Sequence, residues 1–190
     1  IAQEMEEDMD AALAAVKEIG YDYVEHFGIY DFTIDEIRAL MDKHGLECVS
    51  VHDGRVLDQN QIDDCIASTI TLGSKYCAIP GYDLCKNINV APDLFARIGK
   101  KLRDSGIQLL YHNHESEFAV LNGTTVLDKM LDEVPYGLIC PQLDTAWVHY
   151  AGVNPSEYIA KYSGRIPTIH LKDFVCKNVQ PGAIYDLPKD

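Results

Sequence analysis

A short stretch in the middle of the chain is dense in side chains that can bind metals or move protons. His112, His114, Glu115 and Glu117 follow one another closely. They come directly after residues 107–110, an apolar run typical of a buried strand. Because α/β proteins place their chemistry at the carboxyl ends of parallel strands, the stretch predicts a catalytic or metal-binding site.

Most of the other predicted strands end on an acid or an imidazole as well. The residues at these ends are Glu25, His26, His52, Asp53, His112, His114, Asp144, His170, Lys172 and Asp173. Side chains alternate between the two faces of a strand, so His112 and His114 share one face, as do His170 and Lys172. In a closed parallel barrel these ends converge on one mouth.

Mixed imidazole and carboxylate ligands without sulfur suit a divalent ion such as Mn²⁺, Co²⁺, Zn²⁺ or Mg²⁺. Such an ion could bind two oxygens of a hydroxy-ketone or sugar and polarise its carbonyl. A neighbouring carboxylate could then remove the α-proton, and the ion would stabilise the enediolate that results. The residues therefore predict metal-assisted proton transfer on a sugar-like substrate.

Each histidine also has a structural interpretation. A single strand-end histidine, such as His26 or His52, is often only a hydrogen-bonded structural residue. His44 lies in the last turn of a predicted helix, where an imidazole favours the negative end of the helix dipole, and is interpreted as structural. His149 stays open between the two interpretations.

The acidic and basic members have alternatives too. Asp144 followed by Thr145 is typical of a helix N-cap or an Asx-turn. Lys172 and Asp173 are also typical of a pair on the protein surface. The joint pattern at the strand ends is less expected by chance than any one of its members.

Helical and strand-like patterns alternate along the chain. Strands are expected at residues 21–26, 46–52, 76–79, 107–112, 138–143 and 166–170, and helices at residues 4–19, 34–44, 59–72, 92–104, 125–133 and 155–162. There is no G-x-G-x-x-G or P-loop motif. The pattern therefore favours an α/β fold of the (β/α)8 TIM-barrel type over an open doubly wound sheet.

Only about six strands are visible, which is fewer than a complete barrel contains. We expect a single domain over residues 1–190 that lacks the first strand and the last βα units. The chain would then be either a fragment of a longer protein or a shortened barrel that needs a partner to close it, since open strand edges invite association.

Composition narrows the class of protein further. The net charge of −14 and the pI of about 4.7 disfavour nucleic-acid binding. No apolar run is long enough for a membrane span. The six cysteines form no C-x-x-C pair, which indicates reduced thiols in a cytoplasmic protein rather than a disulfide or zinc framework.

At the strand ends the sequence resembles the sugar phosphate isomerase/epimerase family of xylose isomerase-like TIM barrels. This superfamily also includes endonuclease IV-like proteins. Three stretches carry the resemblance: residues 111–118 (YHNHESEF) are similar to the family's YHNHDFEF, residues 143–147 (LDTAW) to LDTxW, and residues 170–173 (HLKD) to HLKD. Residues 20–25 and 50–52 match weaker family patterns.

The resemblance implies a divalent metal ion held by acids and histidines at the strand ends. Asp144 and His170 match two ligand positions of the family. The first family ligand is a glutamate at the end of the fifth strand, where this chain has His112. Glu117 is the expected carboxylate ligand, with His112 as the alternative.

The chain also departs from the family pattern. Trp147 replaces a histidine of some relatives, which implies a wall for the sugar rather than a ligand. The family's last ligand is a glutamate on the final strand, but no glutamate follows Glu157 in this chain. Whether this chain catalyses the reaction alone therefore stays open.

The expected function is that of a metal-dependent isomerase or epimerase acting on a sugar, keto-sugar or sugar phosphate. Glu117, His112, His114 and Lys172 are the expected catalytic residues. The expected substrate-binding residues are Glu25, His52 and Trp147, and the expected metal ligands are Glu117, Asp144 and His170. The partners would be a sugar or polyol and, as a possible assembly, further copies of the chain.

Two other functions stay open. One is an inosose-type dehydratase, because the same enediolate can expel a β-hydroxyl group. The other is a non-catalytic sugar-binding or assembly subunit. A DNA repair nuclease is disfavoured by the acidic charge and by too few histidines for three metal ions.

Overall fold

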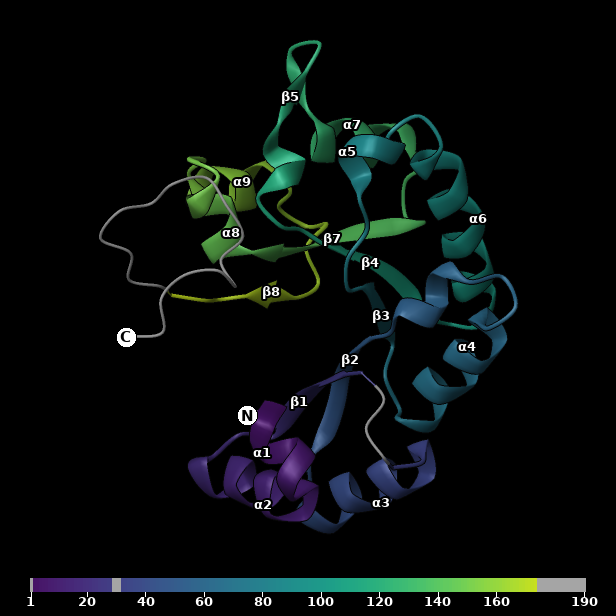
Figure 1. Cartoon of the computed structure of the whole chain (residues 1–190), viewed down its shortest axis with the longest axis vertical. Coiled ribbons are helices and arrows are strands. Elements are labelled where there is room, and N and C mark those ends of the chain that lie inside the picture. Colours follow the sequence, from purple (N-terminus) through teal and green to yellow (C-terminus); the bar gives the residue numbers. More distant parts are fainter. Residues whose placement is uncertain (1, 29–31, 174–190) are drawn as a thin grey trace. The chain divides into compact units, whose positions relative to one another are not determined.

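A computed structural model describes residues 2–28 and 32–173 of the chain (Figure 1). They form two compact units, one from the described residues up to 80 and residues 97–110, and the other from residues 81–96 and 111–173. Within the described residues, no helix is long and apolar enough to cross a membrane.

The first unit is built from βα repeats. Its elements are α1 (Ala2–Glu7), α2 (Met9–Ile19), β1 (Tyr23–Phe27), α3 (Ile34–His44), β2 (Glu47–His52), η1 (Gly54–Leu57), α4 (Ile62–Thr71) and β3 (Tyr76–Ile79). β1 pairs in parallel with β2, and β2 pairs in parallel with β3. Phe27 lies opposite His52 in the first pair, so the carboxyl ends of β1 and β2 are side by side.

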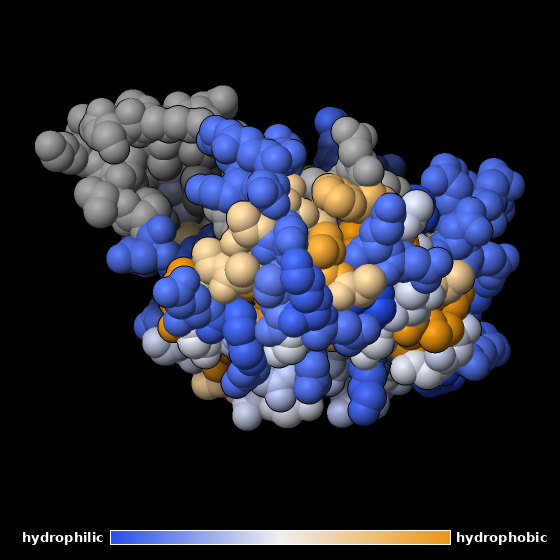
Figure 2. All heavy atoms as spheres, turned by 90° about the horizontal axis from the view of Figure 1, so that it is seen from below, coloured by the Kyte–Doolittle hydropathy of each residue, from blue (hydrophilic) through white to orange (hydrophobic). Residues whose placement is uncertain are grey.

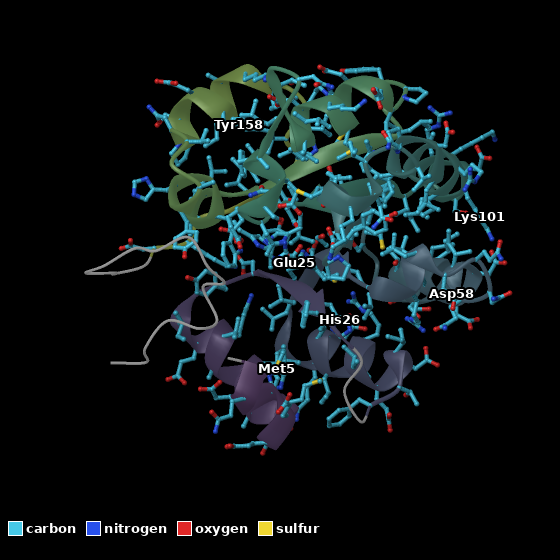
Figure 3. All side chains as sticks on the ribbon, turned by 45° about the horizontal axis from the view of Figure 1, so that its top comes forward. Met5, Glu25, His26, Asp58, Lys101 and Tyr158 are labelled. Carbon is cyan, nitrogen blue, oxygen red and sulfur yellow. The ribbon has the colours of Figure 1, made fainter. Side chains whose placement is uncertain are left out.

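Apolar residues from α2, α3, β2 and the residues flanking β2 and α4 make the core of this unit. They are Met9, Leu13, Val16, Ile37, Met41, Leu46, Cys48, Val51 and Leu72. Met5 of α1 packs against this core (Figure 3). Hydrophilic residues cover much of the face seen in Figure 2, with smaller apolar patches between them. The helices thus bury one apolar stripe each, as amphipathic helices over a sheet do.

Local sequence signals set the helix ends. The predicted helix at residues 4–19 is two helices, because the Asp8 side chain accepts a hydrogen bond from the Ala11 N–H and begins α2 as its N-cap. α3 begins with a capping box, in which Thr33 and Glu36 satisfy each other's backbone N–H groups. Gly20 ends α2 at a φ of 109°, which glycine adopts without strain.

The second unit continues the alternation and adds a hairpin. Its elements are α5 (Leu84–Asn87), η2 (Ser116–Phe118), β5 (Val120–Leu121), β6 (Thr124–Thr125), α7 (Val126–Glu133), β7 (Ile139–Asp144), α8 (Thr145–Tyr150), α9 (Pro155–Lys161) and β8 (Ile169–His170). α6 (Ala91–Asp104) and β4 (Gln108–His112) contribute residues to both units. β5 and β6 are antiparallel and turn at Asn122 and Gly123, both with positive φ (Figure 1).

The main sheet has six strands, in the hydrogen-bonding order β1-β2-β3-β4-β7-β8. β7 and β8 are parallel, and their register places Asp144 directly opposite His170. The predicted alternation of helices and parallel strands is confirmed. The expected strand at residues 166–170 is shorter, Ile169–His170, and the short helix α8 and the hairpin were not predicted. The single domain over residues 1–190 stays a prediction.

A buried carboxylate joins α7 to α9 in the second unit. Asp128 of α7 accepts hydrogen bonds from the Tyr158 hydroxyl, from the Tyr162 hydroxyl at 2.5 Å and from the Lys161 ammonium at 2.6 Å. Figure 3 shows Tyr158 on α9. Burial disfavours ionisation of Asp128, but the hydrogen bonds from Lys161 and the two tyrosines outweigh it and lower the pKa of its carboxyl.

This network predicts a measurable loss of stability when Asp128 is removed. Asp128→Ala leaves buried hydroxyls without their acceptor, so we expect the free energy of unfolding at pH 7 to fall by about 2–4 kcal/mol in urea denaturation. Asp132→Ala, an exposed acid on the same helix, is the matched control. The folded-state pKa of Asp128 is lowered, so its stabilisation is complete above about pH 4 and declines as the pH falls through that pKa. Equal unfolding curves for the two variants would contradict the assignment.

Candidate functional site

Asp144 ends β7 and begins α8, and its two carboxylate oxygens have different surroundings. Oδ1 accepts hydrogen bonds from the backbone N–H groups of Ala146 at 3.1 Å and Trp147 at 3.3 Å. Asp144 is therefore the N-cap of α8, as its structural interpretation predicted. These bonds fix the orientation of the carboxylate, so that Oδ2 faces a different set of groups.

Three basic side chains converge on Oδ2 of Asp144. Lys172 Nζ lies at 2.6 Å, His112 Nε2 at 3.3 Å and His170 Nδ1 at 3.7 Å. Asp144 is fully buried, which disfavours its charged form, but the bonds from His112, His170 and Lys172 outweigh burial and hold the pKa of the carboxyl well below its usual range. Asp144 is therefore a buried anion among cations and imidazoles.

Three of these residues fit a divalent ion. His112, Asp144 and His170 each offer one ligand atom, and the three atoms lie within 4.8 Å of one another. The imidazole rings of His112 and His170 are 4.7 Å apart between centroids. Two imidazole nitrogens and one carboxylate oxygen are a typical donor set for Zn²⁺ or Mn²⁺. An ion bound there would have three protein ligands and open positions for substrate oxygens.

Neighbouring polar groups hold the ligand strands together. The Asn113 side chain accepts a hydrogen bond from the Asp144 N–H at 2.9 Å and donates one to the Asp144 carbonyl at 3.4 Å. The Thr145 hydroxyl donates to the His170 carbonyl at 3.1 Å. Such outer contacts orient metal ligands. Sequence reasoning did not assign a role to Asn113 or Thr145. A side chain that hydrogen-bonds to the backbone of a neighbouring strand leaves no recognisable motif in the sequence.

Glu117 is buried, and among the described residues its carboxylate accepts hydrogen bonds from the end of β4 and from the loop that follows. Oε1 accepts from the Tyr111 hydroxyl at 2.9 Å, and Oε2 accepts from the His114 N–H at 2.9 Å and the Ser116 hydroxyl at 3.3 Å. Among the described residues, Glu117 belongs to no group of side chains with metal-ligand geometry. The expected role of Glu117 as a metal ligand stays a prediction, and its contacts point to shaping the loop.

The His114 side chain lies between two other aromatic rings. Its centroid is 4.9 Å from that of His112 and 5.2 Å from that of Trp147. Trp147 itself is buried and packs edge-on against Tyr150. Trp147 therefore packs against the His114 ring, beside the group of His112, Asp144 and His170.

The first unit has polar strand ends of its own. Glu25 Oε1 lies 3.2 Å from His52 Nε2 across β1 and β2. Asp53 accepts bonds from Arg55 Nε and Nη2, at 2.9 and 2.6 Å to the same oxygen. Figure 3 labels Glu25 and the next residue of β1, His26. Burial lowers the pKa of His26, which keeps it neutral at physiological pH.

In the second unit, the structure brings together His112, Asp144, His170 and Lys172, as the sequence suggested. In the first unit, it pairs Glu25 with His52. Lys172 contacts Asp144 rather than forming only the surface pair with Asp173 that the sequence also allowed. His44 lies 2.6 Å from Asp10, which agrees with its structural interpretation. His149 is an exposed residue of α8.

Comparisons with known proteins agree with this arrangement. The family model for the xylose isomerase-like TIM barrel matches residues 13–184. Inosose dehydratase of Clostridium perfringens (strain 13 / Type A) is 30% identical over 84 residues, which make up 44% of this chain and 28% of that protein. The chain thus spans less than a third of the length of the curated relatives it matches.

Solved structures share the fold. A sugar phosphate isomerase/epimerase from Parabacteroides distasonis ATCC 8503 aligns over 96% of this chain and 79% of its own, with a TM-score of 0.78 and 20% identity. The IOLI protein with a bound zinc atom aligns over 83% of this chain and 64% of its own, with a TM-score of 0.59 and 16% identity. Strand order, strand-end chemistry and a family match over most of the sequence agree, and the chain belongs to the xylose isomerase-like TIM-barrel family.

Proposed function

We propose that this chain carries the metal-binding and proton-transfer residues of a sugar isomerase or epimerase. The observation that carries the proposal is the convergence of His112 and His170 on Asp144 Oδ2, on the side opposite the helix cap. Membership of the family supports it, as does the similarity to a sugar phosphate isomerase/epimerase and to a protein with bound zinc.

We propose His112, Asp144 and His170 as the residues that hold the ion. When bound there, a divalent ion would supply electrophilic stabilisation of negative charge on a substrate oxygen. Asp144 contributes the one formal negative charge, and the helix cap prevents its carboxylate from rotating away. The imidazoles bind in their neutral form, each through one ring nitrogen.

His114 is the proposed proton-handling residue. Its ring lies against His112 and Trp147, so it is held at the edge of the metal-ligand group. As a base it would take the proton from the carbon next to a carbonyl, and the electron pair would move onto the carbonyl oxygen to give an enediolate. Return of the proton to the other face gives an epimer, and return to the neighbouring carbon gives an isomer.

A dehydratase is the second candidate. It is favoured by the local similarity to inosose dehydratase, at 30% identity over 84 residues. The first step would be the same proton removal, after which the enediolate would expel a hydroxide from the β-carbon and form a double bond. The substrate-binding roles of Glu25 and His52 stay predictions.

The proposed metal ligands can be tested by direct binding. Asp144→Asn keeps an oxygen for the helix cap but removes the charge, so we expect the dissociation constant for Zn²⁺ to rise about 100-fold or more, with little loss of helix. His170→Ala should have a similar effect. His149→Ala, an exposed histidine on α8, is the control and should bind like the wild type. Unchanged calorimetric titrations for Asp144→Asn and His170→Ala would exclude this site.

The reaction can be tested by solvent exchange. The protein is incubated with Mn²⁺ and a panel of keto-sugars and inososes in deuterated buffer, and substrates are followed by mass spectrometry. A gain of one deuteron supports proton transfer, and a loss of water identifies a dehydratase. His114→Gln should slow either reaction by about 10²–10⁴-fold, the usual contribution of a general base. Exchange that His114→Gln leaves unchanged would remove His114 from the mechanism.

Glu117→Gln distinguishes a ligand from a residue that shapes the loop. Because both carboxylate oxygens accept hydrogen bonds from β4 or the loop after it, we expect Zn²⁺ affinity to change by less than about threefold and exchange to slow by about 10-fold or more. Tyr111→Phe removes one of these hydrogen bonds and should slow exchange in the same direction. A loss of Zn²⁺ affinity as large as that of Asp144→Asn would instead make Glu117 a metal ligand.

A further inference from the structure

The Lys172 ammonium contacts the same carboxylate oxygen that the proposed ion would bind. Nζ lies 2.6 Å from Asp144 Oδ2, closer than the nearest nitrogen of His112 or His170. Lys172 is two residues beyond His170, just past the end of β8. A protein cation therefore lies directly beside the three proposed ligand atoms.

A divalent ion and this ammonium cannot both keep Oδ2 at short range. Zinc binds carboxylate oxygens at about 2.0–2.2 Å. With Nζ at 2.6 Å from the same oxygen, the two cations would be less than about 5 Å apart. Asp144 is fully buried, so water screens their repulsion poorly. Oδ1 already accepts hydrogen bonds from the N–H groups of Ala146 and Trp147. The two cations therefore cannot bind one to each oxygen and must share Oδ2.

We propose that Lys172 competes with the divalent ion for Asp144, so that ion binding displaces the ammonium. The inference rests on the proposed metal site and adds a role for a residue that is not a ligand. About half of the Lys172 side chain is exposed, which gives the ammonium a route outward. Once displaced, it stays within reach of the ion's open positions as a mobile cation for a negatively charged substrate oxygen. Lys172 thus lowers ion affinity and supplies a second positive charge at the site.

The test is the affinity of the full chain for Mn²⁺ alone, by calorimetry at one fixed pH. Lys172→Met keeps the aliphatic stem and removes the charge, so the dissociation constant for Mn²⁺ should fall about tenfold or more. Lys172→Arg keeps a competing cation and should bind Mn²⁺ within about threefold of the wild type.

Lys161 offers a matched control in the same unit. Its ammonium also lies 2.6 Å from a buried carboxylate, Asp128 Oδ2, and half of its side chain is exposed. Lys161→Met changes the net charge equally, so it reports any general effect of charge on cation binding. We expect its Mn²⁺ dissociation constant to stay within about twofold of the wild type, with folding checked by circular dichroism.

The outcomes separate this inference from the proposed function. If wild type and Lys172→Met bind Mn²⁺ equally, the competition is overturned while the metal site stands. If neither binds Mn²⁺, the metal site and the competition fail together. A second readout is the rate at which an amine-reactive ester labels Lys172, measured by peptide mass spectrometry. Mn²⁺ should raise that rate at Lys172 and not at Lys161, and equal rates with and without Mn²⁺ would contradict displacement.

Discussion

The arrangement of the site depends on how the Asp144 carboxylate is divided between two tasks. One oxygen caps α8 and so fixes the carboxylate relative to the backbone; the other faces the imidazoles of His112 and His170 and the ammonium of Lys172. A buried anion is stable only when its charge is compensated, and here each compensating group comes from a strand end or the residues just after it. The parallel register that sets Asp144 opposite His170 is therefore also what assembles the site.

Much of this could be predicted from the sequence, because it depends on local patterns. Alternating apolar periods indicated the helices and parallel strands, and acids or imidazoles at the strand ends indicated His112, Asp144 and His170. What the sequence could not decide was the direction of each side chain. Glu117 follows the end of β4 closely, but the Tyr111 hydroxyl of β4 and the His114 N–H donate hydrogen bonds to its oxygens. Asn113 acts through backbone groups of another strand, and no spacing rule reports such a contact.

Asp128 shows why residue type alone does not identify a site. It is buried like Asp144, pairs with a lysine at the same 2.6 Å, and has a lowered pKa. Its other partners are the hydroxyls of Tyr158 and Tyr162, which donate hydrogen bonds but do not bind divalent ions as imidazole nitrogens do. Sequence reasoning missed this network, because an acid at the start of an amphipathic helix is typical of a solvated surface.

The two carboxylates differ most in what can replace their lysine. At Asp128 the lysine joins two tyrosine hydroxyls as donors, and among the described residues no group with metal-ligand geometry includes Asp128. At Asp144 two imidazoles stand beside the lysine, and both can act as neutral ligands. The negative charge of Asp144 can therefore be balanced either by the Lys172 ammonium or by an ion that the imidazoles help to hold. A carboxylate with two alternative counter-charges suits a site that binds an ion and also stabilises a negatively charged substrate oxygen.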